Sequence, residues 1–247
     1  MATIDINCDM GEGCPNDAEL MNYVSSVNIA CGAHAGDADI MRRTVECAVE
    51  KGVVIGAHPG YADRENFGRF AMKMSHSEIY DLIRDQFSTL KKIADNAGGE
   101  IKHIKPHGAL YNQSVRDTDL AAVIAKAVFD IDSKLILFGL SGSFSISEAE
   151  NVGLQTASEV FADRTYRSDG SLMPRTEPNA LIHDADAAIS QVMQMINAGT
   201  VTATDGSVIP ITADTICIHG DADNALEFAT AIRRSLKAAN INVAAIF

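Results

Sequence analysis

The sequence lacks the features that mark nucleic-acid-binding and membrane proteins. Its 247 residues carry 33 acidic against 20 basic side chains, a net charge of −13, and no cluster of Lys or Arg stands apart from that background. Phosphate backbones and anionic membranes would therefore be repelled. No apolar run approaches the ~18 residues of a membrane span, and residues 1–10 do not resemble a signal peptide. We expect a cytoplasmic protein without nucleic-acid or membrane partners.

Cysteine and glycine motifs are also missing. The five cysteines are odd in number and include no C-x-x-C pair, which predicts reduced thiols rather than a disulfide scaffold. Neither G-x-G-x-x-G nor G-x-x-x-x-G-K-[ST] occurs, so the sequence supports neither a Rossmann dinucleotide site nor a P-loop. No linker rich in Pro, Gly or Ser divides the chain, and we expect residues 1–247 to form one domain.

What the chain does contain is a regular alternation of predicted strands and helices. Strand-like runs occur at 2–8, 25–31, 52–58, 100–106, 134–140, 153–160 and 215–220, with an eighth candidate at 242–247. Helical periodicity marks 38–52, 77–99, 118–130, 184–199 and 223–240. Such alternation predicts an α/β fold with a parallel sheet covered by helices. Seven or eight units favour a closed TIM-barrel-like (β/α) barrel over a doubly wound open sheet.

Polar residues cluster where these predicted strands end. His34, His58, His107 and His219 lie at or just past the carboxyl ends of four strands, and in a parallel barrel all such ends meet on one face, where the active site is built. Imidazoles and carboxylates suit either a divalent metal or general acid-base catalysis. Asp9, His34 and His58 form the natural metal triad. A metal-free hydrogen-bond network explains them equally well, because no H-x-x-x-H or H-E-x-x-H spacing is present.

Other residues near the strand ends allow two interpretations each. Lys105 could bind a carboxylate or phosphate, or act as a base if burial lowers its pKa. Asp163 and Arg164 could position a substrate or form an ion pair that holds their loop. Cys31 could be a nucleophile beside His34, although a small buried thiol is the better interpretation.

The motifs resemble those of the LamB/YcsF family, which includes the A subunit of prokaryotic 5-oxoprolinase. The matching segments run in order between residues 4 and 224: IDINCDMGEG, NIACGAHAGD, IGAHPGY, FGR, KPHGALYN, EVFADRTY, LMPR and CIHGD. The resemblance implies a seven-stranded β/α barrel similar to those of glycoside hydrolases and polysaccharide deacetylases. It further implies ATP-dependent hydrolysis of 5-oxo-L-proline to L-glutamate, with ATP cleaved to ADP and phosphate, in a complex with partner subunits B and C.

The site residues that we predict lie on these motifs or beside them. Catalytic roles are expected for Asp9, Glu12, His58, Lys105, His107 and His219. Substrate binding is expected from Asn28, His34, Asp37, Glu159, Asp163, Arg164, Arg175 and Asp221. Two departures from the family pattern concern the pocket wall: Phe70 stands where the family usually has a second arginine, and the loop GEGCPNDAEL is shorter than usual.

Three functions remain open at the level of the sequence. The first is the ATP-dependent lactam hydrolase, with the nucleotide site on this chain or on a partner. The second is a metal-dependent deacetylase or amidohydrolase that acts alone, suggested by Asp9, His34 and His58. The third is a non-catalytic scaffold subunit, and self-association into a homo-oligomer is compatible with all three.

Overall fold

Seven parallel strands close into a barrel in the computed structural model, which describes residues 2–220 and 225–246. The barrel strands are β1 (Thr3–Met10), β2 (Ser26–Ala30), β3 (Val54–His58), β4 (Ile101–Ile104), β5 (Ile136–Leu140), β6 (Gln155–Phe161) and β9 (Thr215–His219). Each pairs with the next in this order, and β9 returns to β1 with Asp5 opposite Thr215 and Asp9 opposite His219. This closing pair confirms the predicted barrel and excludes the open sheet.

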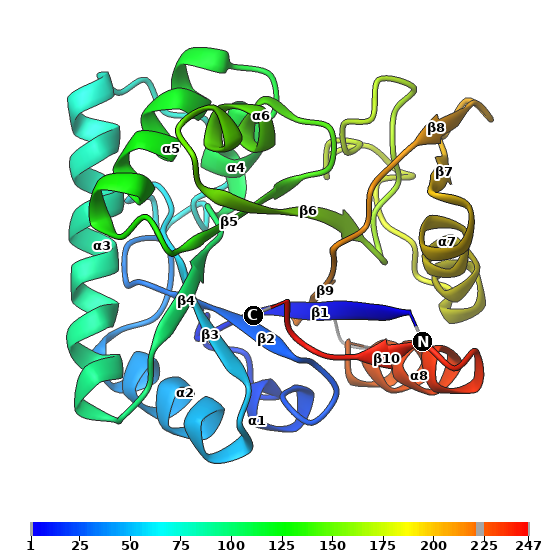
Figure 1. Ribbon diagram of the computed structural model, residues 1–247, viewed down its shortest axis with the longest axis horizontal. Coiled ribbons are helices and arrows are strands. Elements are labelled where there is room, and N and C mark those ends of the chain that lie inside the picture. The colour runs from blue at the N-terminus through cyan, green and yellow to red at the C-terminus, as the bar shows by residue number, and fades with distance from the viewer. Residues whose placement is uncertain (1, 221–224, 247) are drawn as a thin grey trace.

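Helices surround the barrel, as Figure 1 shows. The five that the sequence predicted are α2 (Ala38–Lys51), α3 (His76–Asn96), α5 (Thr118–Ile131), α7 (Ala185–Ala198) and α8 (Ala225–Ala238). Local signals set their ends: Ser75 and Glu78 form a capping box at the start of α3. Gly52, with φ of 67°, ends α2 in the left-handed conformation that glycine adopts without a Cβ clash.

Several short elements escaped the sequence-based prediction. They are α1 (Asp17–Leu20), α4 (Gly108–Ser114), α6 (Phe144–Asn151) and an antiparallel hairpin of β7 (Thr200–Thr202) and β8 (Val208–Pro210). The eighth predicted strand is reduced to β10 (Asn242–Val243), which pairs with the first residues of β1 beside the barrel rather than within it. Short segments carry too few residues to show a helical or strand period.

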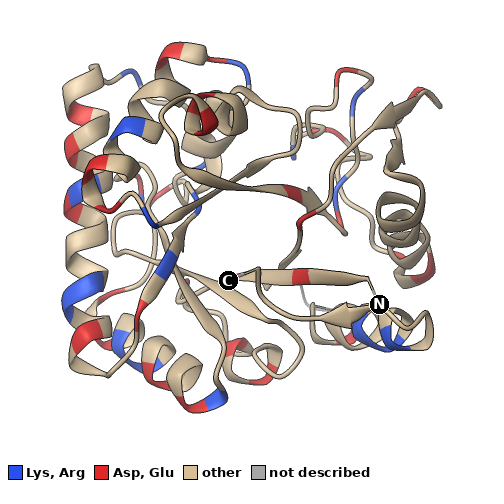
Figure 2. Ribbon diagram, in the orientation of Figure 1, with Lys and Arg blue, Asp and Glu red and all other residues tan. Residues whose placement is uncertain are grey.

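The two faces of the barrel strands differ in chemistry. Outward residues of β1 such as Ile4 and Ile6 join the main apolar core against the helices. Asp5 and Asn7 are instead buried in the lumen, where both hydrogen-bond with Thr215 of the adjacent strand β9. Figure 2 shows isolated charged positions on β1, β4 and β6, of which the one on β4, Lys102, is partly exposed, while most charges lie on the surrounding helices. A TIM-type lumen is ordinarily filled by branched apolar side chains. Here hydrogen-bonded polar side chains fill much of it, next to a small apolar cluster of Ile136, Phe138 and Ala157.

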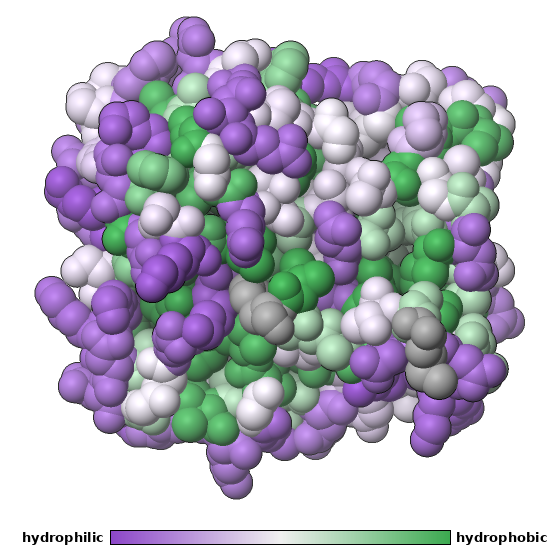
Figure 3. All heavy atoms as spheres, in the orientation of Figure 1, coloured by the Kyte–Doolittle hydropathy of each residue, from purple (hydrophilic) through white to green (hydrophobic). Residues whose placement is uncertain are grey.

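The outer surface is mostly hydrophilic around the margin of the face in Figure 3, with apolar residues gathered between the purple regions. Among the described residues, no helix combines the length and apolarity needed to cross a bilayer.

One glycine makes room for the polar lumen. His103 is fully buried, and its Nε2 lies 2.8 Å from the Asn28 Oδ1 on a neighbouring part of the barrel. A Cβ at Gly56 of β3 would stand only 2.0 Å from that same nitrogen. Any larger residue at position 56 therefore collides with the imidazole, whose ring stacks on Phe138.

We expect Gly56→Ala to lower the free energy of unfolding by about 1–3 kcal/mol or more, because an added methyl overfills a packed interior. The measurement is urea denaturation followed by circular dichroism. The double variant Gly56→Ala/His103→Ala provides the control, since removing the ring creates space for the methyl. If Gly56→Ala lowers the free energy of unfolding as much in the His103→Ala variant as in the parent, the collision with the imidazole is not the cause of the loss.

Candidate functional site

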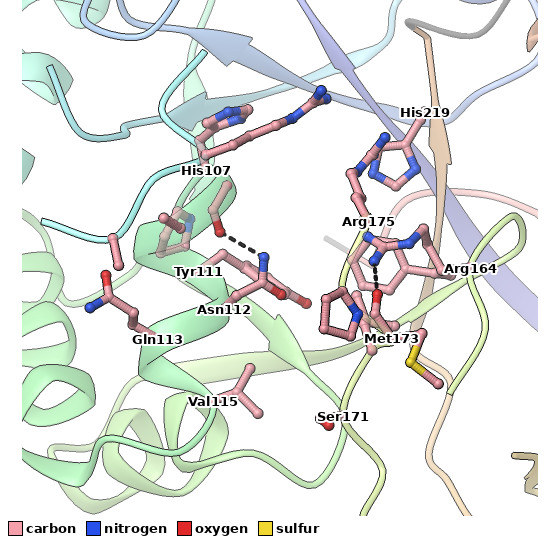
Figure 4. Close-up of a pocket in the computed structure, with 18 of the residues that line it drawn as sticks. His107, Tyr111, Asn112, Gln113, Val115, Arg164, Ser171, Met173, Arg175 and His219 are labelled. Carbon is pink, nitrogen blue, oxygen red and sulfur yellow. Dashed lines mark hydrogen bonds between the residues drawn. The ribbon is translucent and has the colours of Figure 1, made fainter. Parts of the chain in front are cut away.

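A cavity of about 660 Å³ opens at the carboxyl ends of the strands. Its wall combines strand ends with α4 and with the loop that follows β6, and Figure 4 shows His107 and His219 on opposite sides of it. Eight of the predicted site residues line it: Asp9, Glu12, His58, Lys105, His107, Arg164, Arg175 and His219. The strand-end rule thus brings residues from five segments, distant in sequence, to one cavity.

The other predicted residues lie elsewhere. His34, Asn28, Glu159 and Asp163 are behind the wall, in contact with residues that line it. Asp37 is exposed and serves as the N-cap of α2, where its carboxylate accepts from the Ile40 N–H; its geometry is that of a helix cap rather than of a substrate ligand. Asp221 lies outside the described residues.

Three histidines and one glutamate converge at one end of the cavity. The His34 and His107 rings stack, with centroids 3.7 Å apart, and the Glu12 Oε1 lies 3.1 Å from the His34 Nε2 and 3.3 Å from the His107 Nδ1. The His58 Nε2 lies 2.9 Å from the His107 Nδ1. We call Glu12, His34, His58 and His107 the histidine cluster.

Hydrogen bonds to backbone carbonyls fix how two of these rings are protonated. The His58 Nδ1 is 2.7 Å from the Lys105 carbonyl oxygen, and the His107 Nε2 is 2.8 Å from that of Phe67. Each of these nitrogens must carry the hydrogen, so the two nitrogens that face each other, His58 Nε2 and His107 Nδ1, both present lone pairs when the rings are neutral. A cation is required between them, either a proton or a metal ion.

A proton on His58 is favourable when no metal is bound. Burial lowers the pKa of His58, but the Asp9 carboxylate, 3.4 Å from its Nε2, outweighs burial and raises it. His107 and His34 differ: burial and the neighbouring His58 hold the pKa of His107 well below its ordinary value and lower that of His34 to about 3. The metal-free cluster therefore holds one proton, on His58.

The cluster also suits a divalent ion. Its four donor atoms all lie within 4.8 Å of one another, whereas ligand atoms around tetrahedral zinc stand roughly 3.3 Å apart; the donors would have to draw together around an ion. Carbonyl partners behind His58 and His107 are the outer-shell contacts that orient metal ligands. The sequence predicted a metal triad of Asp9, His34 and His58. In the structure His34 and His58 instead group with Glu12 and His107, and Asp9 groups with Cys217 and His219.

Lys105 fills the lumen immediately below the cavity. Its Nζ lies 2.9 Å from Asp9 and 2.8 Å from Glu159, and the side chain is 3% exposed. Burial lowers its pKa, but the charges of Asp9, Cys217 and Glu159 together raise it well above the ordinary value. This direction favours the ammonium form of Lys105 and its role as a cation over a role as a base. Asp9 in turn stays ionised: burial raises its pKa, yet His58 and Lys105 hold it well below the ordinary range.

Contacts bear on the remaining alternatives. Asp163 accepts from the His219 Nδ1 at 2.7 Å, while Arg164 donates to the carbonyls of Ala180 and Met173. Arg164 thereby holds its loop through backbone oxygens. Cys31 is buried, and burial raises the pKa of its thiol to about 12, which makes it inert as a nucleophile. Phe70 is 63% exposed at the cavity rim.

Sequence reasoning missed several contributors to the site. His103 and Cys217 face the lumen, Tyr111 packs beside Lys105, and Arg167 lines the cavity. A signal for the first two was present: lumen residues recur every second position, as in His103 and Lys105 or Thr215, Cys217 and His219. Tyr111 and Arg167 lie on a short helix and a loop, where no such period applies.

Comparison with known proteins identifies the family. The model of the LamB/YcsF family matches residues 4–247. The chain belongs to the LamB/YcsF family. It is 50% identical to the A subunit of 5-oxoprolinase from Bacillus subtilis (strain 168), over 100% of this chain and 98% of that one. It is 48% identical to the protein of the same name from Brevibacillus brevis, over 100% of this chain and 99% of that one.

Solved structures of family and fold relatives agree with the barrel. The crystal structure of the lactam utilization protein from Thermus thermophilus superposes with a TM-score of 0.92, at 38% identity and with 100% of both chains covered. A family 4 carbohydrate esterase from Streptomyces lividans gives a TM-score of 0.55 at 14% identity, over 100% of this chain and 93% of that one. The second likeness is one of fold alone.

Replacing Lys105 should test the charge balance of the lumen. We expect Lys105→Met to lower the free energy of unfolding by about 3–5 kcal/mol, because it leaves two buried carboxylates without their cation. Lys102→Met is the matched control: that lysine is on the same strand and pairs with Glu100 at the surface, where an ion pair contributes under about 1 kcal/mol. Equal small losses in urea denaturation of both variants would contradict the assignment.

Metal binding by the histidine cluster can be measured on chelator-treated protein. We expect calorimetric titration with Zn²⁺ to show one ion per chain, and His107→Asn or Glu12→Gln to weaken binding at least about 100-fold, beyond the effect of outer-shell residues. His219→Asn is the control, because it belongs to the other group of donors. Unchanged zinc affinity in His107→Asn, or an equal loss in His219→Asn, would place the ion elsewhere.

Proposed function

We propose that this chain is the A subunit of an ATP-dependent 5-oxoprolinase, which hydrolyses 5-oxo-L-proline to L-glutamate as ATP is cleaved to ADP and phosphate. The observation that carries the proposal is the match of 48–50% identity, over 100% of this chain, to proteins named as the A subunit of 5-oxoprolinase. That those relatives are named as subunits supports action within a complex, and we propose subunits B and C as the partners.

The cavity supplies groups that the opening of a lactam requires. Water must be deprotonated to attack the carbonyl carbon, and the amide nitrogen must gain a proton as it leaves. His58 can hold one proton at Nε2, with the ionised Asp9 beside it to stabilise the imidazolium. His107 is neutral, so its Nδ1 can accept a proton. Neighbouring residues with opposite protonation suit a reaction with an acid step and a base step.

A divalent ion in the histidine cluster would add Lewis-acid polarisation of the substrate carbonyl. The residues that would hold it are Glu12, His34, His58 and His107. Glu12 would then serve as a ligand, and proton transfer would fall to Asp9 and His219, which line the same cavity.

Coupling to ATP serves to activate a stable amide. Phosphorylation of the amide oxygen would turn a poor electrophile into one that water can attack. The sequence contains no P-loop, which favours a nucleotide site on a partner or on basic cavity residues.

The histidine cluster also supports a second candidate, a metal-dependent amidohydrolase or deacetylase that acts alone. Its three histidines and a carboxylate are donors of the kind that catalytic zinc uses. The two candidates separate on one point, because the second predicts turnover by the single chain without ATP. A scaffold role gains less support, since a scaffold does not need a buried, proton-holding cluster at a cavity.

The decisive assay is ADP release that depends on 5-oxoproline, with this chain alone and with subunits B and C. We expect activity only in the full complex, and we expect His107→Asn to abolish it. Circular dichroism should show that the variant stays folded. Arg84→Gln, on the exposed face of α3, is the control and should retain the parental rate. Turnover by the chain alone without ATP, or parental activity of His107→Asn, would refute the proposal.

A further inference from the structure

The wall opposite the histidine cluster is strongly cationic. Five arginines line the cavity of a chain whose net charge is −13: Arg69, Arg116, Arg164, Arg167 and Arg175. Two of them, Arg164 and Arg175, lie beside His219 in Figure 4, across the cavity from His107. Arg69 lies over Phe67, beside the histidine cluster. The other four belong to the wall formed by the end of α4 and the loop after β6, and this positive charge suits a negatively charged occupant.

Arg164 is held as a rigid, buried donor. The residue is only 5% exposed, and its Nε and Nη2 donate to the carbonyls of Ala180 and Met173. These contacts fix the plane of the guanidinium. The remaining nitrogen, Nη1, has no hydrogen bond to the described residues, and the residue lines the cavity.

Arg175 brings a second positive charge to the same place. Burial and the repulsion from Arg175 lower the pKa of Arg164 to about 10. The nearby carboxylate of Asp163 contacts the His219 Nδ1, with both oxygens within 2.9 Å, and it also interacts electrostatically with Arg175 and Arg164, so that it offsets part of their charge. Farther out, at the rim, Arg116 is paired with Asp169. Two adjacent guanidiniums that line an open cavity form a binding site for an oxyanion, which accepts from both.

We propose that Arg164 and Arg175 form an oxyanion subsite of the cavity, which holds the charged group of a ligand whose reacting bond lies at the histidine cluster. Its biological use rests on the proposed function, and it names two groups that this reaction contains. One is the carboxylate of 5-oxoproline. The other is a phosphoryl group. Both present oxygens that a guanidinium binds through parallel N–H donors.

The subsite can be tested by calorimetric titration of inorganic phosphate and of 5-oxoproline into chelator-treated protein, so that neither binds through a metal. We expect Arg175→Gln to weaken binding of the anion at least about tenfold, the loss of one hydrogen bond between charged groups. Arg164→Lys keeps the positive charge but loses the paired N–H donors of the guanidinium, and it should weaken anion binding by a similar factor. Arg116→Gln is the matched control, with the same change of charge at the rim, and should leave affinity within about twofold.

The two titrations separate the two sources of the anion. If the substrate carboxylate occupies the subsite, Arg175→Gln weakens 5-oxoproline binding, and phosphate competes with it. If a phosphoryl group does, Arg175→Gln weakens phosphate binding alone, and saturating 5-oxoproline leaves phosphate affinity unchanged. The proposal is overturned if Arg175→Gln and Arg164→Lys bind both anions as the parent does, or if Arg116→Gln costs as much as Arg175→Gln, which would indicate diffuse attraction.

Failure of the subsite and failure of the proposed function give different results. Anion binding is measured on the single chain without partners or turnover. A chain that binds anions through Arg164 and Arg175 but supports no 5-oxoproline-dependent ATP cleavage keeps the subsite and loses the function. A chain that supports 5-oxoproline-dependent ATP cleavage, but whose anion binding does not depend on Arg164 and Arg175, keeps the function and loses the subsite.

Discussion

The ammonium of Lys105, buried between two carboxylates, is the interaction on which the rest of the site depends. Asp9 of β1 and Glu159 of β6 reach it at 2.9 and 2.8 Å. A buried ion pair seldom adds net stability over apolar packing, but removing one partner is costly. The arrangement is therefore better understood as a device that fixes position. It keeps Asp9 ionised at the foot of the cavity, 3.4 Å from His58.

Below Lys105, a column of hydrogen-bonded side chains in the lumen holds Asp9 and Glu159 in position. Asn7 donates to Glu159 and Thr215, and Asn28 donates to Asn7 and Asp9. Each polar side chain in this column satisfies another, as burial in a low-dielectric interior requires. The column leaves little freedom for Asp9 to move. A lumen filled by apolar side chains could not hold a carboxylate and an ammonium at the floor of the cavity.

Whether the sequence could predict a part of this structure depends on whether that part repeats with a regular period. The long elements were predictable because amphipathic helices and buried strands repeat with periods of 3.6 and 2 residues, and barrel topology then placed His58, His107 and His219 at one rim. The membership of the histidine cluster was not. Glu12 replaces Asp9 there because the loop after β1 turns the Glu12 carboxylate toward His34 and His107. The conformation of such a loop leaves no periodic pattern in the sequence, so it could not be predicted. Asp37 lay on a site motif, yet caps a helix.

The cavity is polarised, and its polarity limits how a ligand can lie. One end offers Glu12, His58 and His107, with His34 behind them, which suit a metal ion or a proton. The other offers the guanidiniums of Arg164 and Arg175, which suit an oxyanion. A small anionic amide that reversed its orientation would place a carboxylate against Glu12 and an apolar ring against Arg164. Both contacts are unfavourable, the first by repulsion and the second by desolvation without a partner. For a ligand bound as proposed, the charges that line the cavity therefore favour one orientation over the other.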